Sequence, residues 1–350
     1  MPRPEDYIEE EKTADYRYLK LMGTHLEMGQ QLADEIGPLP PVPAKKPLTL
    51  SQITFAEECW DVISSFHPTL LDEYEGWAEA LDLEMDALLG MLIAGIEGTN
   101  LGCSSFALRR QGRTIVGRNY DFFYWARLRY LIAAQPEAYY ATLGMNDGLL
   151  SGRHDGLNQH GLFVALHRVG SKAPERVEPG VAFHLIPRIL LETCATAEEA
   201  VMMAQEMPHL SSFNYTIVDP HDMFVVEAYP EMVRVREAEN DYIAATNHFL
   251  HDDLSPLIES PILENSKRRL QKMLSALSKG NSDPWALAQE ILTDHQTPLC
   301  GHVDGLATLW SVISDLTNQK VAYSLGAPCR NKYKEYPWPE GKEEEAFLGS

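Results

Sequence analysis

One predicted β-hairpin constrains the fold of this chain more than any other stretch. Ser105–Leu108 is short and largely apolar, Thr114–Val116 is apolar and β-branched, and the polar segment between them contains a glycine that suits a tight turn. If the turn centres on Gln111–Gly112, antiparallel pairing places Cys103 opposite Tyr120, to within a residue or two. The hairpin therefore predicts which residues lie beside this cysteine.

Two charged residues of the second strand, Arg118 and Asp121, are expected close to the sulfur of Cys103. A nearby guanidinium lowers the pKa of a thiol and so favours the reactive thiolate. Gly102 directly precedes the cysteine, and the combination suggests a nucleophile made by self-cleavage, a cysteine that becomes an N-terminus. The residues alone leave a second interpretation open, a reduced and buried cysteine on a strand.

The composition excludes several classes of partner. A net charge of -22 over 350 residues repels nucleic acid and anionic membrane surfaces, so we expect neither as a partner. Residues Met1–Glu11 have no apolar core, which argues against a secretory signal, and the longest apolar run, Ala87–Ile96, is too short to span a bilayer. We therefore expect a cytoplasmic protein that builds one large domain or two ordinary ones.

The number and spacing of the cysteines also fit a cytoplasmic protein. Five is an odd number, and no two of them form a CxxC pair, so we expect neither a disulfide framework nor a zinc ribbon. They are Cys59, Cys103, Cys194, Cys300 and Cys329.

The chain changes its pattern near residue 100, from helical periodicity to strands. Apolar residues recur every fourth position over Met28–Ile36, which predicts a helix ended by Gly37. Ser51 is expected to cap the next helix, and a third helix is expected within Ala87–Ile96.

Strand patterns after residue 100 are interrupted by pairs of helices. Four strands are expected to form a meander: Tyr215–Val218, Met223–Val226, Val233–Arg236 and Tyr242–Ala245. Helices are expected around 183–190, after Thr196 with Glu199 as a capping box, and over Leu270–Leu277. The last strands are expected at Thr308–Ile313 and Val321–Leu325. This arrangement predicts an α+β fold, with sheets covered by helices.

The motif Gly102–Ser105 followed by Gly117–Phe122 resembles the N-terminal-nucleophile amide hydrolases of the penicillin acyltransferase and choloylglycine hydrolase group. Further segments are similar to the acyltransferase branch, that of acyl-CoA:6-aminopenicillanic acid acyltransferase, and they fall in the order of that branch. They are Leu21–Gly29, Asp155–Leu162, Thr246–His248, Asn265–Arg269 and Thr308–Ser311. The resemblance covers nearly the whole chain.

The resemblance implies a four-layer αββα sandwich, with two antiparallel sheets between helical layers. It also implies autocatalytic cleavage of a zymogen between Gly102 and Cys103. Residues 1–102 would form a helical chain that stays bound, and residues 103–350 would form the catalytic chain, the two making one domain. The partners implied are a small-molecule amide substrate and the cleaved N-terminal chain, and a homo-oligomer stays open.

The chemistry implied is attack of Cys103 on a linear amide carbonyl, giving a thioester that water or an amine resolves, with no metal or organic cofactor. The new α-amine of Cys103, with an ordinary pKa of about 8, would accept the thiol proton. Asp121 would orient that amine, and Arg118 would favour the thiolate. Asn247 would donate to the oxyanion, and Arg269 would steady the constellation or bind a substrate carboxylate.

Two further residues are candidates to line the site. Ser105 shares a strand face with Cys103. His167 stands where the bile-salt branch has an asparagine, and this departure argues against bile-salt chemistry. The long segment before Cys103 argues the same way.

Other interpretations stay open at this stage. An uncut cysteine–histidine hydrolase would pair Cys103 with His167 or His302, and a binding protein on the same fold would lack catalysis. A metal hydrolase is disfavoured, because the i, i+3 pair His248 and His251 lies in a loop-like segment without an HExxH pattern. Without the resemblance, Arg118 and Asp121 could form a structural ion pair, Asn247 could cap a turn, and Arg269 could lie on a solvated helix face.

Overall fold

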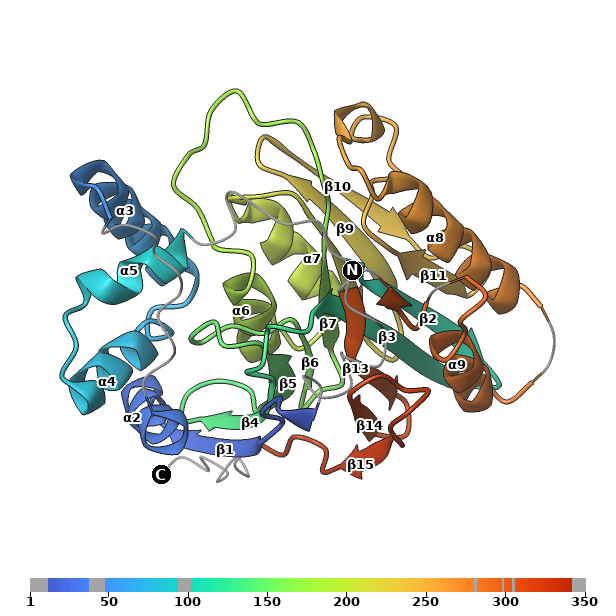
Figure 1. The fold of residues 1–350 in the computed structure, drawn as a ribbon, viewed down its shortest axis with the longest axis horizontal. Helices are drawn as coiled ribbons and strands as arrows, with labels where there is room; N and C mark the ends of the chain where they lie inside the picture. The colour runs from blue at the N-terminus through green and yellow to red at the C-terminus, as the bar shows by residue number, and fades with distance from the viewer. Residues whose placement is uncertain are drawn as a thin grey trace, which may run out of the picture.

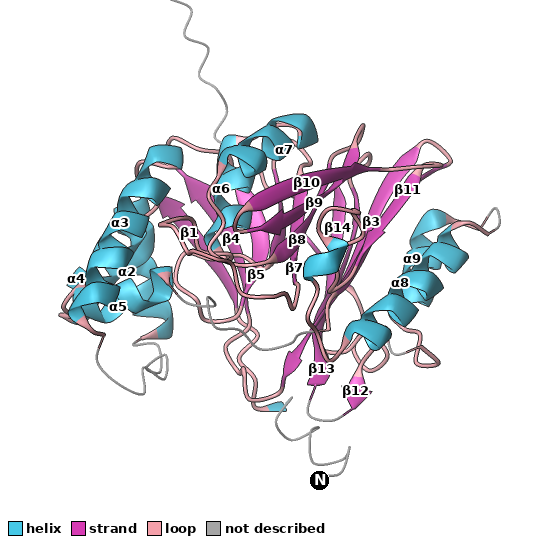
Figure 2. Ribbon diagram, turned by 90° about the horizontal axis from the view of Figure 1, so that it is seen from above, coloured by secondary structure: helices cyan, strands magenta, loops and turns pink. Residues whose placement is uncertain are grey.

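Two β-sheets pack face to face between layers of helices in the computed structural model (Figures 1 and 2). The structure describes residues 12–37, 48–93, 102–279, 282–297, 299–303 and 306–341. Three apolar cores separate the four layers: one between the sheets, one under each helical layer. The predicted αββα sandwich is therefore confirmed. Among the described residues, no helix is long and apolar enough to cross a membrane.

The larger sheet has eight strands in the order β1-β4-β5-β6-β7-β8-β9-β10. Their bounds are β1 Tyr18–Gly23, β4 Tyr130–Pro136, β5 Thr142–Asn146, β6 Asp155–Asn158, β7 Phe163–Arg168, β8 Phe213–Val218, β9 Met223–Tyr229 and β10 Met232–Glu237. All neighbours are antiparallel except β1 and β4, which run parallel. The prediction that the segment before Cys103 is wholly helical is therefore wrong at β1. Leu19 and Leu21 alternate into the core there, the period of a strand.

The second sheet carries the predicted hairpin. Its strand order is β11-β2-β3-β13-β14-β15, with β12 paired to β13. The bounds are β2 Ser104–Arg110, β3 Arg113–Phe123, β11 Tyr242–Ala245, β12 His302–Val303, β13 Leu306–Asp315, β14 Lys320–Leu325 and β15 Lys334–Tyr336. The expected four-strand meander holds for β8, β9 and β10, but β11 crosses to this sheet and pairs with β2.

The hairpin has the register that the sequence predicts. Ser104 pairs with Asn119, so Cys103 comes to lie opposite Tyr120 at the next position. The turn holds Gln111–Gly112 at φ values of 54° and 71°. Positive φ values at both central residues are typical of the two-residue hairpin turn whose twist matches that of the paired strands.

Helices α6 Leu185–Thr193 and α7 Ala197–Glu206 pack on the outer face of the larger sheet, and α2 His25–Ile36 packs on β1. Helices α3 Leu50–Phe66, α4 Asp72–Leu81 and α5 Asp86–Leu92 group with α2 beside the sheet and share its apolar core. Two other helices cover the second sheet: α8 Leu263–Leu277 and α9 Pro284–Leu292. Gly37 ends α2, and Thr196 caps α7 through a capping box with Glu199, as predicted. Thr49, not Ser51, caps α3, because its hydroxyl accepts from the Gln52 N–H while the Gln52 side chain accepts from the Thr49 N–H.

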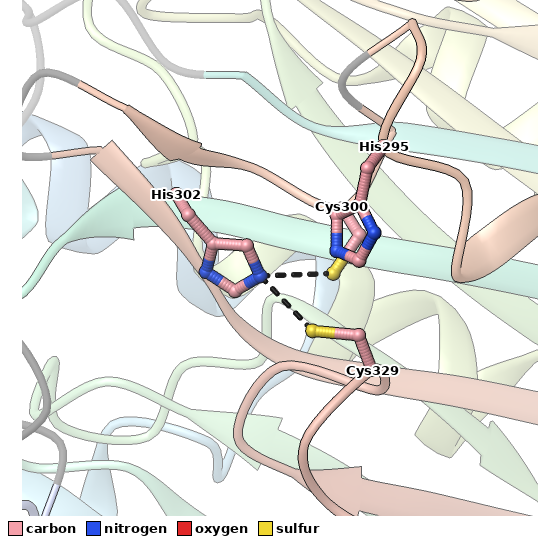
Figure 3. A group of neighbouring side chains, drawn as sticks. All are labelled: His295, Cys300, His302 and Cys329. Atoms are coloured by element: carbon pink, nitrogen blue, oxygen red, sulfur yellow. Dashed lines mark hydrogen bonds between the residues drawn. The ribbon is translucent and has the colours of Figure 1, made fainter. Parts of the chain in front are cut away.

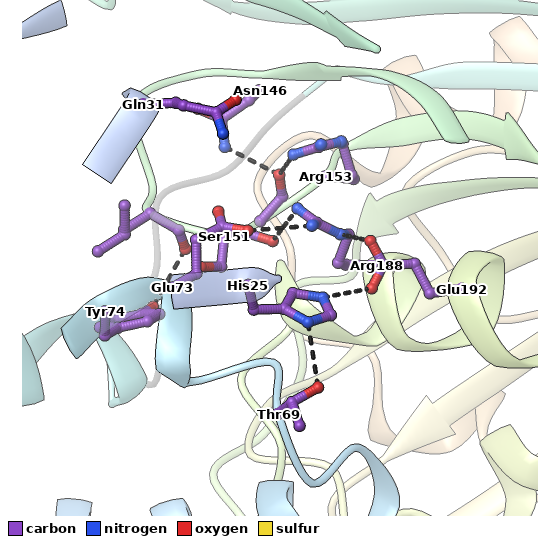
Figure 4. Close-up of polar contacts among 12 residues, drawn as sticks. His25, Gln31, Thr69, Glu73, Tyr74, Asn146, Ser151, Arg153, Arg188 and Glu192 are labelled. Atoms are coloured by element: carbon purple, nitrogen blue, oxygen red, sulfur yellow. Dashed lines mark hydrogen bonds and ion pairs between the residues drawn. The ribbon is translucent and has the colours of Figure 1, made fainter. Parts of the chain in front are cut away.

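A buried polar network ties the segment before Cys103 to α6 (Figure 4). Glu192 accepts from His25 Nε2 at 2.9 Å and His67 Nε2 at 3.0 Å, and it pairs with Arg188. Arg188 also pairs with Glu73 at 3.0 Å. Burial opposes the charge of Glu192, but Arg188 and both histidines hold its pKa well below the ordinary value. The network therefore joins residues of α2, α4 and α6 by charge as well as by apolar packing.

Glu192→Gln should lower the free energy of unfolding by about 3–5 kcal/mol, because it leaves the buried Arg188 and two histidines without their anion. Chemical denaturation at neutral pH measures this. The loss should shrink in acid, since a carboxylate with a depressed pKa contributes stability above that pKa and loses it as the pH falls through it. The matched control is Glu178→Gln, whose partner Arg176 is 79% exposed, and it should change stability by less than about 0.5 kcal/mol. Equal effects of the two substitutions would contradict a stabilising network.

Candidate active site

Cys103 lies directly before β2, and its side chain belongs to the core between the two sheets. It is fully buried. Ser105 is on the same side of β2, as expected, and its hydroxyl bonds Thr216 Oγ1 of the larger sheet at 2.7 Å. Ser105 therefore links the sheets beside the cysteine, with its hydroxyl already partnered.

Arg118 reaches the sulfur from β3 on this inter-sheet side. Its Nη2 lies 4.0 Å from Cys103 Sγ and donates to Leu166 O at 2.7 Å. Its Nη1 donates to His154 O at 2.7 Å and pairs with the Asp155 carboxylate. Burial disfavours the Arg118 charge, but Asp155 more than compensates and raises the pKa of Arg118 above its ordinary value. A permanent positive charge thus stands beside the thiol.

The surroundings of Cys103 favour its protonated thiol over the thiolate. Burial raises the pKa of Cys103, and the charge of Asp121 adds to that effect. Arg118, Arg269 and a backbone hydrogen bond from Asp121 act in the opposite direction without cancelling the burial. In the uncut polypeptide the cysteine therefore needs a proton acceptor before it can act as a nucleophile.

Asp121 approaches Cys103 from the side of the second sheet that faces the helices. Its Oδ1 accepts from Thr308 Oγ1 of β13 at 2.6 Å, and Thr308 Oγ1 in turn accepts from Gly301 N at 2.9 Å. Burial raises the pKa of Asp121 to about 7, although Arg269, the Thr308 hydroxyl and Arg118 all favour the carboxylate. A carboxyl with this pKa can exchange protons near neutrality.

Arg269 connects the cysteine to Asn247. From α8 its Nη1 donates to Cys103 O at 2.5 Å and to Ser104 Oγ at 2.7 Å. Its Nη2 donates to Asn247 Oδ1 at 2.7 Å, and its Nε donates to Asn265 Oδ1 at 2.7 Å. Arg269 is 1% exposed, so the interpretation as a solvated helix face is wrong. It holds the backbone of Cys103.

Asn247 follows β11 and is buried. Its backbone N–H donates to Ser266 Oγ at 2.8 Å, and its Nδ2 donates to Arg168 O at 2.9 Å. The amide nitrogen carries a second hydrogen. Asn247 is thus held at both ends of its side chain, by Arg168 and Arg269.

The two histidines considered as partners for Cys103 have other surroundings. His167 is fully buried, its Nδ1 lies 3.3 Å from Asn214 O, and burial with the nearby Arg118 keeps its pKa well below the ordinary value. His302 Nε2 lies 3.0 Å from Cys329 Sγ and 3.5 Å from Cys300 Sγ. His248 bonds Ser266 Oγ at 2.8 Å and so belongs to the support of Asn247.

The sequence analysis did not name Asp155, Trp310 and Thr308 as site residues, although all three support the site. Asp155 pairs with Arg118 and also accepts from Trp310 Nε1 at 2.7 Å. Thr308 holds Asp121. All three lie within motifs quoted for the resemblance, Asp155–Leu162 and Thr308–Ser311. Their spacing along the chain does not indicate which residues they contact, because β6 and β13 belong to different sheets.

Comparison with known proteins identifies the family. The model of the acyl-coenzyme A:6-aminopenicillanic acid acyl-transferase family matches residues 108–330, more than half of the chain. The chain belongs to this family, as the motifs predicted. Family and four-layer fold together make it an amidohydrolase or acyltransferase of the N-terminal-nucleophile type.

The chain is similar to a mutant of conjugated bile acid hydrolase from Clostridium perfringens, at 16% identity and a TM-score of 0.48, over 68% of this chain and 98% of that chain. It is also similar to the Caenorhabditis elegans orthologue of N-acylethanolamine-hydrolyzing acid amidase, at 18% identity and a TM-score of 0.46, over 61% of this chain and 93% of that chain. No curated protein sequence matches.

The Asp121 carboxyl should titrate with a midpoint of about 7, protonated below and ionised above. NMR of protein labelled at aspartate carboxyl carbons measures this, in a Cys103→Ala background that should keep the chain uncut. Thr308→Val removes a donor to the carboxylate and should move the midpoint up by about 1 unit. The control Thr293→Val, whose hydroxyl bonds Gln289 O on α9, should leave the midpoint unchanged. A midpoint near 4 would contradict the role of burial.

Proposed function

We propose that this protein is a self-processing cysteine amidohydrolase or acyltransferase, which cuts itself between Gly102 and Cys103 and then cleaves linear amides through a Cys103 thioester. One observation carries the proposal: Cys103 is buried at the start of β2 between two arginines, one beside its sulfur and one on its carbonyl. Arg118 and Arg269 both lower the pKa of its thiol. Such positive surroundings distinguish a reactive cysteine from an inert, buried one.

The processing step begins in the intact chain. Cys103 Sγ attacks the Gly102 carbonyl, and its proton is taken up by Asp121, whose pKa of about 7 suits a base at neutral pH. The peptide C–N bond then breaks, the Cys103 nitrogen takes back a proton, and an acyl–sulfur bond joins Gly102 to the thiol. Water hydrolyses that thioester to a Gly102 carboxylate and a free thiol. The products are a new α-amine on Cys103 and two chains.

The catalytic step uses this amine as the base. It takes the thiol proton, and the thiolate attacks the amide carbonyl of the substrate. Asn247 donates its amide hydrogen to the oxyanion, and Arg118 favours the thiolate. The α-ammonium protonates the leaving amine, which leaves an acyl thioester on Cys103. Water then releases an acid, or an acceptor amine takes the acyl group.

The alternatives from the sequence receive less support. His167 is held neutral by burial and by Arg118, so it is a poor acceptor for the Cys103 proton. The Nε2 of His302 faces Cys300 and Cys329. A binding protein on this fold would need neither Arg118 beside the Cys103 sulfur nor an Asp121 carboxyl with a pKa of about 7. The first substrate to assay is the pair named by the family, an acyl-coenzyme A with 6-aminopenicillanic acid; N-acyl amino acids, acyl-homoserine lactones and peptides follow.

Wild-type protein should separate into two chains, one beginning Cys-Ser-Ser-Phe, whereas Cys103→Ala should remain one chain of 39.4 kDa. Intact mass and N-terminal sequencing measure this. His167→Ala is the control and should still be cut, because Asp121 and not a histidine takes up the Cys103 proton in the processing step. An uncut wild type, or a His167→Ala protein that is uncut and inactive, would favour the cysteine–histidine interpretation.

Asn247→Ala should lower turnover of an amide substrate by about 10²–10³-fold, the usual effect of losing an oxyanion donor. Asn265→Ala is a matched control, since each asparagine gives Arg269 one acceptor at 2.7 Å and Asn265 has no proposed role at the oxyanion. It should lower turnover by less than about tenfold. Both variants are compared after processing, with the amounts of the two chains equalised. Similar losses in both would assign Asn247 a supporting role alone.

A further inference from the structure

Four metal-binding side chains gather on the second sheet outside the nucleophile site: His295, Cys300, His302 and Cys329 (Figure 3). One ligand atom from each lies within 4.8 Å of the other three. His302 Nε2 is 3.0 Å from Cys329 Sγ and 3.5 Å from Cys300 Sγ, and the two histidine rings are 5.4 Å apart between centroids. None of the four has a role in the proposed amide chemistry.

We propose that His295, Cys300, His302 and Cys329 bind one zinc ion through two thiolates and two imidazoles. A tetrahedral zinc site has Zn–S bonds of about 2.3 Å and Zn–N bonds of about 2.0–2.1 Å, which puts its ligand atoms roughly 3.3–3.8 Å apart. The contacts of His302 already come close to this spacing. Two sulfur and two nitrogen ligands in a tetrahedron select zinc over calcium, magnesium and manganese, which prefer oxygen.

The chain spacing hides this site from sequence analysis. Cys329 follows His302 by 27 residues, and no CxxC pair is present. The second sheet brings the ligands together, since β12 carries His302 and Cys329 lies in the turn after β14. Cys300 is 1% exposed, whereas His295 and Cys329 are exposed, so an ion can reach the ligands from solvent.

With four protein ligands the site is closed, which is typical of structural zinc rather than catalytic zinc. It would fasten the segments 294–297 and 299–303 to the turn after β14. The segment 299–303 also supports the nucleophile site, because Gly301 N donates to Thr308 Oγ1, which holds Asp121. In addition, Leu299 O accepts from Asn119 Nδ2 of β3 at 2.7 Å. Zinc would thus stabilise the backbone beside Asp121 without touching substrate.

A second cluster of potential metal ligands, His25, His67 and Glu192, is less suited to a cation. Its carboxylate is already paired with Arg188, whose positive charge disfavours a cation there. The cysteine–histidine cluster has no such ion pair among its four members. The charges of its two thiolates would instead balance those of the divalent ion.

The test is the metal content of the purified protein, expressed with zinc and isolated without chelators. Elemental analysis should find about one zinc per protein molecule, whether or not it is cut into two chains. After removal of zinc, added Co²⁺ should give thiolate-to-cobalt charge-transfer bands and the visible bands of tetrahedral cobalt. Cys300→Ala/Cys329→Ala should lower the zinc content at least about tenfold and abolish these bands.

Two controls keep the outcome clear. Cys59→Ala/Cys194→Ala removes two other buried cysteines and should retain full zinc, as should Cys103→Ala, so the result does not depend on the proposed amide chemistry. His295→Ala removes one proposed ligand at an exposed position and should lower the zinc content below that of the wild type. Wild-type protein that takes up neither zinc nor cobalt would overturn the proposal. Zinc retained by the Cys300→Ala/Cys329→Ala protein would also overturn it. So would a Cys300–Cys329 disulfide in place of the metal, which an intact mass lower by two hydrogen atoms would reveal.

Discussion

The buried guanidinium of Arg118 is the interaction on which the rest of the site depends. It crosses from β3 to the larger sheet, where Asp155, His154 O and Leu166 O take its hydrogens. Asp155 is fully occupied in turn by Trp310 Nε1 and the Tyr323 hydroxyl. A buried charge is tolerated only when it is paired and hydrogen-bonded, because desolvation otherwise exceeds the Coulombic gain. Arg118 therefore links the two sheets beside Cys103.

A second buried arginine completes the site from the opposite side. Arg269 holds the carbonyl of Cys103 and the side chain of Asn247, and its charge acts on Asp121. Cys103 is thus contacted at both its sulfur and its backbone by cations on opposite faces of one sheet. Rigid elements rather than loops carry both arginines, β3 and α8, which keeps the geometry precise enough for catalysis.

The local parts of this protein could be predicted because their causes are local. The Gln111–Gly112 turn, the capping box at Thr196 and the register that puts Cys103 opposite Tyr120 follow from backbone propensities within a few residues. The failures have a common cause as well. β1 joins the larger sheet in parallel with β4, and β11 leaves its meander for the second sheet, since each buries its apolar face against strands distant in the chain.

By itself, the sequence determined the hairpin, the layered αββα class, the family and the candidate residues Cys103, Arg118, Asp121, Asn247 and Arg269, because short-range periodicity and ordered motifs carry that information. Only the tertiary structure decided what those residues touch. It placed Asp155 on Arg118, Thr308 on Asp121, and His295, Cys300, His302 and Cys329 around one point. Each of these contacts joins segments that neither spacing nor composition relates. Burial is the reason for the contacts of Asp155 and Thr308, because a buried polar group needs a hydrogen-bond partner.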